Sequence, residues 1–187
     1  LQGAMIAAEE QAFTDILTGL KNRRAFDYIM ERQIVSGHGF ALMQIDLAFF
    51  KAVNDSLGHA AGDHVLQTVS QIMIEEIRET DTVARLGGDE FAILFPGVSD
   101  AAVLTSIGQL IISELEMSIH FQDKVCQVSA SIGTVFNLMD SSSTAKQLFE
   151  NADIALYASK RMGRAQQTFF TEDLKALAWA DEGTAVQ

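Results

Sequence analysis

The sequence predicts an α+β domain in which helices flank a central, mainly antiparallel sheet. Strand-type apolar segments alternate with segments of helical periodicity, and a glycine pair joins two adjacent strand segments. The resulting order, strand, helix, strand, strand, helix, strand, is that of a βαββαβ core. With 187 residues, 48% of them hydrophobic, the chain is long enough for one domain with a substantial core.

Apolar periodicity and turn residues place each expected element. Helical segments repeat apolar residues every three to four positions, and strand segments are continuously apolar or alternate. In chain order we expect a helix over 23–35, a strand over 40–50, a helix over 63–78, two strands within 81–95, a helix over 100–117, a strand over 124–136, a helix over 144–162 and a short strand over 166–170. Asn22 or Thr18 is expected to cap the first helix, and residues 51–63 to form a loop with a short helical turn.

Composition narrows the classes of function. The net charge of −12 argues against a nucleic-acid partner, because binding a phosphate backbone needs a basic surface. A single cysteine, Cys126, excludes an internal disulfide and favours a reducing compartment. No apolar run is long enough to span a membrane, so we expect no membrane contact by this segment. Residues 1–14 are expected to end a helix or linker from a longer chain, and residues 171–187 to form a C-terminal extension.

The stretch RLGGDEFAILF, residues 85–95, places two glycines and two acids between strand segments. In a βαββαβ core the first strand, which Asp46 ends, neighbours this hairpin, so Asp46, Asp89 and Glu90 could converge. Converging carboxylates without a cation would repel one another. With Mg²⁺ they form a hard-oxygen site that leaves room for substrate phosphates. Taken alone, the turn could equally be a solvated hairpin tip, because Gly and Asp are common turn residues.

Five motifs in sequence order resemble the GGDEF family of diguanylate cyclases. They are DILTGLKNRR (15–24), IDLAFFKAVNDSLGHAAGD (45–63), RLGGDEFAILFPG (85–97), SASIG (129–133) and NADIALYASKRMGR (151–164). The resemblance implies a palm-like (ferredoxin-like, nucleotidyl-cyclase-like) catalytic domain over 15–170, located in the cytoplasm. It also implies that two such domains, face to face as a homodimer, join two GTP molecules into cyclic di-GMP and release pyrophosphate, with Mg²⁺ or Mn²⁺ as cofactor.

The resemblance also assigns catalytic roles. Asp46 and Asp89 match the metal ligands, assisted by the backbone carbonyl of Leu47. Glu90 matches either a second metal ligand or the acceptor of the 3′-hydroxyl proton, and a plain salt-bridge role stays open. The family usually has a further acid where this chain has Ala48, so a carboxylate on the same side of the strand is missing.

Substrate-binding roles fall on three further segments. Asn54 and Asp63 match the guanine-reading positions, although an Asn in a turn and an Asp capping a helix are the alternatives. Lys160 and Arg164 match the phosphate-contacting cations and, being four residues apart, are expected on one helical face. The remaining substrate-binding candidates are His59, expected to shape its loop rather than act as a base, Gly87 and Gly88.

A product-inhibitory site is implied by Arg78 and Asp81, an RxxD that ends shortly before the GGDEF motif. Asp15 and Arg23 are expected to tie the first motif together. The tail FFTEDLKALA (169–178) resembles a connector to a phosphodiesterase domain, and a sensory region is expected in the full protein. Two rival functions remain: a non-catalytic sensor of GTP or cyclic di-GMP, favoured by Ala48, and another nucleotidyl transfer on a palm-like core.

Overall fold

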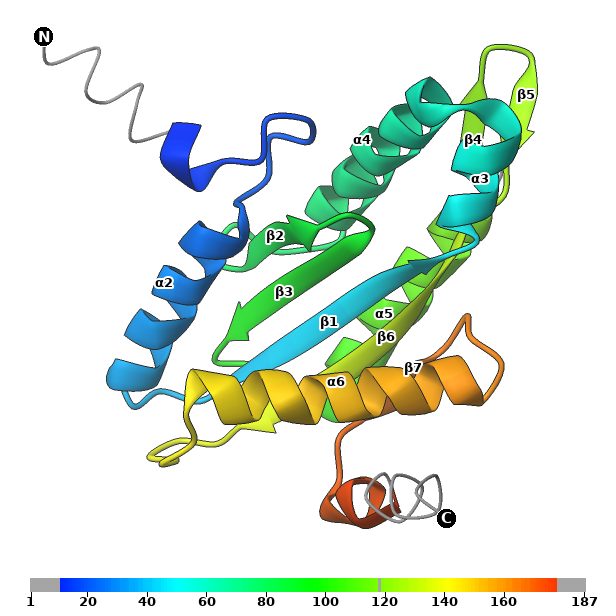
Figure 1. Ribbon diagram of the computed structural model, residues 1–187. Helices are drawn as coiled ribbons and strands as arrows, with labels where there is room; N and C mark the ends of the chain where they lie inside the picture. Colours follow the sequence, from blue (N-terminus) through cyan, green and yellow to red (C-terminus); the bar gives the residue numbers. More distant parts are fainter. Residues whose placement is uncertain (1–10, 118, 178–187) are drawn as a thin grey trace, which may run out of the picture.

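A five-stranded sheet forms the centre of the domain (Figure 1). The computed structural model describes residues 11–117 and 119–177. In chain order the strands of this sheet are β1 (Phe40–Ala48), β2 (Thr82–Gly87), β3 (Glu90–Pro96), β6 (Ser129–Asn137) and β7 (Gln167–Phe169). Their spatial order is β2-β3-β1-β6-β7, and β6 and β7 pair in parallel while the other neighbours are antiparallel. The expected α+β class and mainly antiparallel sheet are confirmed.

Helices cover both faces of the sheet (Figure 1). They are α2 (Arg23–Val35), α3 (Phe50–Leu57), α4 (His59–Glu75), α5 (Ala101–Glu116) and α6 (Ala145–Arg161). One apolar cluster joins α4 and α5 to the first face, and a second joins α2 and α6 to the other. The sheet is therefore buried on both sides, as its nearly continuous apolar strands require.

Alternation along β1 decides which face its acid reaches. Met43 and Ile45 are fully buried against α4 and α5, whereas Phe40 and Leu42 pack with α2 and α6. Because successive side chains point to opposite faces, Asp46 shares the α6 face with Leu42. The Asp46 carboxylate therefore lies on the α6 face of the sheet, near the C-terminal end of β1.

Several boundaries differ from the expectation. Residues 51–63 form most of α3 and the first turn of α4 instead of a loop, because Gly58, with φ of 90°, ends one helix and starts the next. Asn22 caps α2 as expected, accepting from the backbone N–H of Ala25 at 3.0 Å. The strand expected over 124–136 is broken: β4 (Ile119–Phe121) and β5 (Lys124–Cys126) form a separate hairpin before β6. Leu110, an apolar residue of α5, is 47% exposed.

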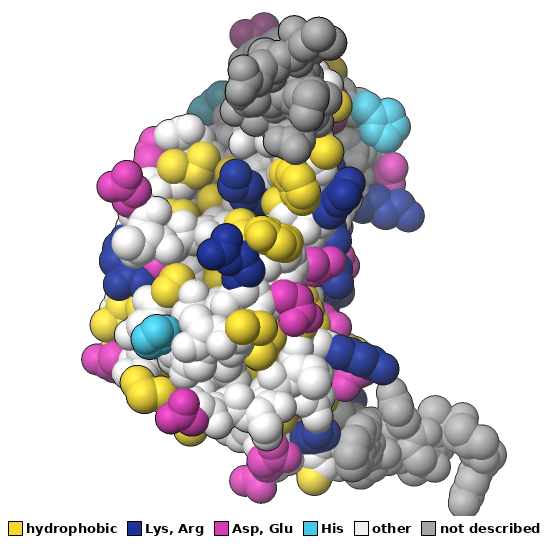
Figure 2. Space-filling view, turned by 90° about the vertical axis from the view of Figure 1, so that its left-hand side faces the viewer, with side chains coloured by type: hydrophobic (Ala, Val, Ile, Leu, Met, Phe, Trp, Pro, Cys, Tyr) yellow, Lys and Arg dark blue, Asp and Glu magenta, His cyan; other side chains and the backbone are white. Residues whose placement is uncertain are grey.

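Residues 1–10 of the expected N-terminal helix end lie outside the described residues, as does the end of the C-terminal extension. Among the described residues no helix is both long enough and apolar enough to cross a membrane. On the face that carries α2, Figure 2 shows Lys and Arg side chains interspersed with acidic and apolar ones.

Candidate active site

The acids of β1 and of the GGDEF turn converge at one end of the sheet. Asp46 lies directly opposite Glu90 in the β1–β3 register, so their side chains share a face. The backbone N–H of Leu47 donates to the carbonyl of Asp89 at 3.1 Å, which ties the strand end to the turn. Partial burial, followed by the negative charge of Asp46, raises the pKa of Asp89. Asp46 and Asp89 therefore lie close enough for the charge of Asp46 to act on Asp89.

The two glycines of the turn are required by backbone conformation. Gly88 has φ of 51° and Gly87 has φ of 154°, values that residues with a Cβ rarely adopt. A Cβ on either glycine would meet nothing within 4 Å, so the space around the turn is open. The glycines therefore shape the turn beside the acids and leave room for a ligand to approach it.

Arg85, which the sequence interpretation did not single out, anchors this turn. Its Nε and Nη2 donate to the carbonyl of Gly88 at 2.9 and 2.8 Å, and its Nη1 lies 3.2 Å from Asp15 Oδ1. Burial acts to raise the pKa of Asp15, but hydrogen bonds from Thr18 and the charge of Arg85 outweigh it and hold that pKa below its ordinary value. Asp15 thus pairs with Arg85 and not with Arg23, whose partner is the nearby Asp27.

Helix α6 brings a cation to the same acids. Lys160, in its last turn, places Nζ 2.7 Å from Asp46 Oδ2. The helix can lie this close to the sheet because a Cβ at Gly133 of β6 would collide with the α6 backbone at Ala152 and Leu156. Ser159 secures the same contact by donating to the carbonyl of Ile132 at 2.7 Å.

Arg164 does not share a helical face with Lys160, because α6 ends at Arg161. Three successive residues with positive φ follow: Gly163 at 110°, Arg164 at 62° and Ala165 at 52°. The backbone N–H of Arg164 donates to the carbonyl of Ser159 at 3.0 Å, which turns the chain back toward the end of the helix.

The two expected guanine-reading residues lie side by side on α3 and α4. A Cβ at Gly62 would overlap the side-chain amide of Asn54, so this amide lies against the α4 backbone next to Asp63. Asp63 is the fifth residue of α4 and is exposed, so the alternative that it caps the helix is wrong. His59, the first residue of α4, is also exposed. The pair therefore presents an amide and a carboxylate where α3 meets α4.

The amino-acid sequence matches a family model, "Diguanylate cyclase, GGDEF domain", over residues 12–166. The chain belongs to this family. It is 34% identical over 93% of its length to the cyclic di-GMP phosphodiesterase NbdA of Pseudomonas aeruginosa, covering 22% of that protein. It is 38% identical over 83% of its length to the probable diguanylate cyclase DgcE of Escherichia coli K12, covering 14% of it.

A solved structure, the coiled coil and GGDEF domain of DgcB from Caulobacter crescentus in complex with c-di-GMP, has the same fold. It superposes with a TM-score of 0.83 at 30% identity, over 90% of this chain and 91% of that one. The chain spans less than half of the length of the curated relatives it matches. The comparisons therefore establish the GGDEF domain and its fold.

Metal binding by this GGDEF domain can be judged from its donor atoms. Asp46 and Asp89 supply carboxylates at the same end of the sheet, and Leu47, whose backbone N–H donates to the carbonyl of Asp89, directly follows Asp46. Within the described ranges no group of three or more His, Cys, Asp or Glu side chains could hold a metal ion. Mg²⁺ typically takes one or two carboxylates together with substrate phosphates and water, so this small set suits Mg²⁺ brought by a nucleotide.

Asp153, on α6, is a further acid that the sequence interpretation did not select. Partial burial raises its pKa, while the facing amide of Gln44 and the charges of Arg23 and Lys160 act to lower it. Gln44 itself is buried, and its Oε1 has no hydrogen-bond partner. Asp153 lies inside the motif NADIALYASKRMGR, and its place in this motif is the signal that could have identified it.

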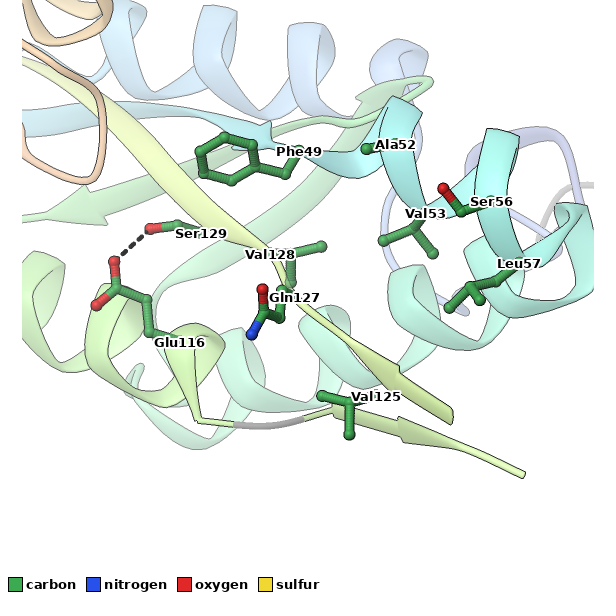
Figure 3. Close-up of a pocket in the computed structure, with 10 residues that line it drawn as sticks. All are labelled: Phe49, Ala52, Val53, Ser56, Leu57, Glu116, Val125, Gln127, Val128 and Ser129. Atoms are coloured by element: carbon green, nitrogen blue, oxygen red, sulfur yellow. Dashed lines mark hydrogen bonds between the residues drawn. The ribbon is translucent and has the colours of Figure 1, made fainter. Parts of the chain in front are cut away.

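A pocket beside α3 holds none of the expected site residues (Figure 3). Its volume is about 580 Å³, and its walls come from α3, the segment linking β5 to β6, and Glu116 at the end of α5. Phe49, with φ of 67°, lies at its rim and is 62% exposed. The carboxylates, Lys160 and Asn54 do not line this pocket.

The residues expected to bind the inhibitory product form a closed pair. Arg78 Nη2 lies 2.6 Å from Asp81 Oδ1, and the same carboxylate accepts from the backbone N–H of Arg78 at 2.8 Å. The Asp81 side chain is only 1% exposed, whereas that of Arg78 is 55% exposed. Arg78 also donates to the carbonyl of Pro96 at 3.1 Å. In this arrangement a ligand can reach the arginine but not the carboxylate beneath it.

Proposed function

We propose that this domain is a Mg²⁺-dependent diguanylate cyclase. The proposal rests mainly on one observation. Three separated segments bring Asp46, Asp89 and Lys160 to one end of the sheet. Two carboxylates for a metal and a cation for phosphate are what phosphoryl transfer requires, since its catalysis is mainly positioning and charge stabilisation. Membership of the GGDEF family supports GTP as the substrate.

The reaction joins two nucleotides. The 3′-hydroxyl oxygen of each GTP attacks the α-phosphorus of the other, the bond from that phosphorus to the bridging oxygen of the β-phosphate breaks, and pyrophosphate leaves. The metal, when bound, neutralises phosphate charge and lowers the pKa of the attacking hydroxyl. Glu90, exposed next to Asp89, is placed either to accept the hydroxyl proton or to hold a second metal. Lys160 and Arg164 bind the phosphates.

Base recognition falls to Asn54 and Asp63. The Asp63 carboxylate accepts from the N1–H and N2–H₂ donors of guanine, and the Asn54 amide can meet a further edge atom. One domain holds one GTP, so turnover requires two domains facing each other. Product bound at Arg78 would hold two domains in a pairing that keeps their GTP sites apart. Contact of both Arg78 and Asp81 with cyclic di-GMP requires Arg78 to release Asp81.

Incubation of the protein with GTP and Mg²⁺, followed by chromatographic separation of the nucleotides, tests the proposal. We expect cyclic di-GMP and pyrophosphate from the wild-type chain and none from an Asp89→Ala variant that folds normally. The specific activity should rise with protein concentration if two domains must meet. A folded wild-type chain that yields no cyclic di-GMP over a wide concentration range contradicts the proposal.

The second candidate function is a non-catalytic sensor that binds GTP or cyclic di-GMP. Two observations favour it: Ala48 stands where the family usually has an acid, and one similar protein is named a phosphodiesterase. Calorimetry distinguishes the two functions, because a sensor binds the nucleotide with no product formed. Restoring the acid with Ala48→Asp should then create activity if the missing carboxylate is the cause.

A further inference from the structure

Lys160 is shared by several carboxylates at the candidate site. Its Nζ contacts Asp46 Oδ2 at 2.7 Å, and its charge acts to lower the pKa values of both Asp89 and Asp153. The Lys160 and Asp46 side chains are 33% and 18% exposed, so water screens their attraction only partly. A second cation arriving at Asp46 would therefore meet both an occupied carboxylate and a nearby positive charge.

On the basis of the proposed function, we propose that Lys160 and the divalent metal compete for the Asp46 carboxylate. The domain then takes up metal together with nucleotide phosphate and binds the metal alone only weakly. Lys160 is in this respect a positioning residue: it holds Asp46 in place and excludes free metal until a phosphate offers its ammonium a better partner.

The donor set makes this competition effective. No group of three or more His, Cys, Asp or Glu side chains within the described ranges could hold a metal, and Ala48 adds no carboxylate. The ammonium of Lys160, in contact with Asp46 and close to Asp89, reduces the negative charge that a divalent ion would meet at these two carboxylates. Phosphate oxygens restore the negative charge that a divalent ion needs, so metal and nucleotide should bind cooperatively.

The side chain can make the exchange without movement of its helix. Lysine carries a point charge on a flexible four-carbon stem, unlike the planar fork of arginine. The α6 backbone is held against Gly133, and Ser159, the neighbour of Lys160, is bonded to Ile132. The exchange is therefore a change of Lys160 rotamer that carries Nζ from a carboxylate oxygen to a phosphate oxygen.

Binding of Mn²⁺ alone, in the absence of nucleotide, tests the proposal on the whole chain. Electron paramagnetic resonance of free Mn²⁺ gives the dissociation constant for the wild type and for Lys160→Met, which keeps the stem but removes the charge. We expect Lys160→Met to bind Mn²⁺ at least about tenfold more tightly. Lys160→Arg, which keeps the charge, should stay within about twofold of the wild type.

Lys146→Met is the matched control, because Lys146 lies on the same helix, is 85% exposed and pairs with Glu150. It should leave Mn²⁺ binding unchanged. The double variant Lys160→Met, Asp46→Asn should lose the gain, which locates the metal at Asp46. Equal Mn²⁺ affinity in Lys160→Met and the wild type overturns the proposal, and so does a gain that survives loss of Asp46.

The outcome is independent of turnover. A wild-type chain that makes no cyclic di-GMP while Lys160→Met gains Mn²⁺ affinity would contradict the proposed function and support the competition. A chain that makes cyclic di-GMP while Lys160→Met shows no gain would support the function and overturn the competition.

Discussion

Two ion pairs flank the GGDEF turn, and they differ in how firmly each is held. Arg85 contacts Asp15 and donates twice to the carbonyl of Gly88, while Asp15 also accepts from the backbone N–H and the hydroxyl of Thr18. Lys160 makes one short contact with Asp46. A planar guanidinium with several fixed acceptors is hard to displace, whereas a single ammonium contact can exchange. The first pair fixes the shape of the turn, and the second leaves its acid available to a ligand.

The largest expected effect is a loss of turnover when the Lys160–Asp46 pair is changed. Asp46→Asn keeps the shape but removes the charge that a metal needs, so the rate of cyclic di-GMP formation should fall by about a hundredfold or more. The free energy of unfolding should change little, because the lost partner is a partly exposed ammonium. Rates and urea denaturation on the same samples check both halves. Turnover near the wild-type rate would remove Asp46 from the metal site.

The second largest expected effect is a loss of stability when the Arg85–Asp15 pair is changed. Arg85→Ala should lower the free energy of unfolding by about 2–3 kcal/mol, because it removes the guanidinium partner of the partly buried Asp15 and both donors to the Gly88 carbonyl. Arg85→Lys should recover less than half of this loss, since one ammonium cannot reach both acceptors. Urea denaturation of the two variants measures the loss, and a full recovery with lysine would show that only the charge matters.

The contributions of Asp89 and Asp15 to the free energy of unfolding should depend on pH in opposite directions. The pKa of Asp89 is raised on folding, so the folded state binds its proton more tightly and the free energy of unfolding falls as the pH rises from 3.8 through the raised value. The pKa of Asp15 is lowered, so its contribution is present above 3.8 and is lost as the pH falls through the lowered value.

At neutral pH Asp89→Asn should therefore stabilise the protein, by at most about 1 kcal/mol after solvent screening, while Asp15→Asn destabilises it. Both changes in the free energy of unfolding should shrink in acid. For Asp89→Asn the change should vanish at pH values below 3.8. Urea denaturation at a series of pH values measures these changes. Two curves that bend in the same direction would contradict the assignment.

The smallest effect is expected at an exposed pair of the same helix that carries Lys160. Lys146 lies 3.8 Å from Glu150, and both side chains are more than half exposed. Lys146→Ala should change the free energy of unfolding by less than about 0.5 kcal/mol. A larger change in denaturation would mean that exposure alone does not rank the ion pairs of this domain.

The fold was predictable where periodicity is long, and less so where elements are short. Strand β1 and helix α6 show their patterns over nine or more residues, so both were located to within a few positions. The β4–β5 hairpin has three residues per strand, too few for any period to appear. Asp63 was considered as a cap because an apolar stripe follows it, but the conformation of Gly58 starts the helix earlier.

The candidate site was predictable in its acids and not in their partners. Adjacency of the first strand and the hairpin in a βαββαβ core was enough to bring Asp46 and Asp89 together. The contact of Lys160 with Asp46 spans 114 residues, and that of Arg85 with Asp15 spans 70. No local spacing reports such contacts, because they depend on where α6 and the N-terminal segment pack against the sheet.

The absence of a side chain at Gly133 has a consequence for the dynamics of the domain. Because the α6 backbone lies directly on β6 there, a sliding of the helix would have to break the contact with Ala152 and Leu156. We therefore expect little slow collective motion of α6, and rotamer exchange of the side chains at its end can proceed without it. The amide protons of α6 should accordingly exchange with solvent deuterium at the same slow rate with and without nucleotide, even while the side chain of Lys160 changes its partner.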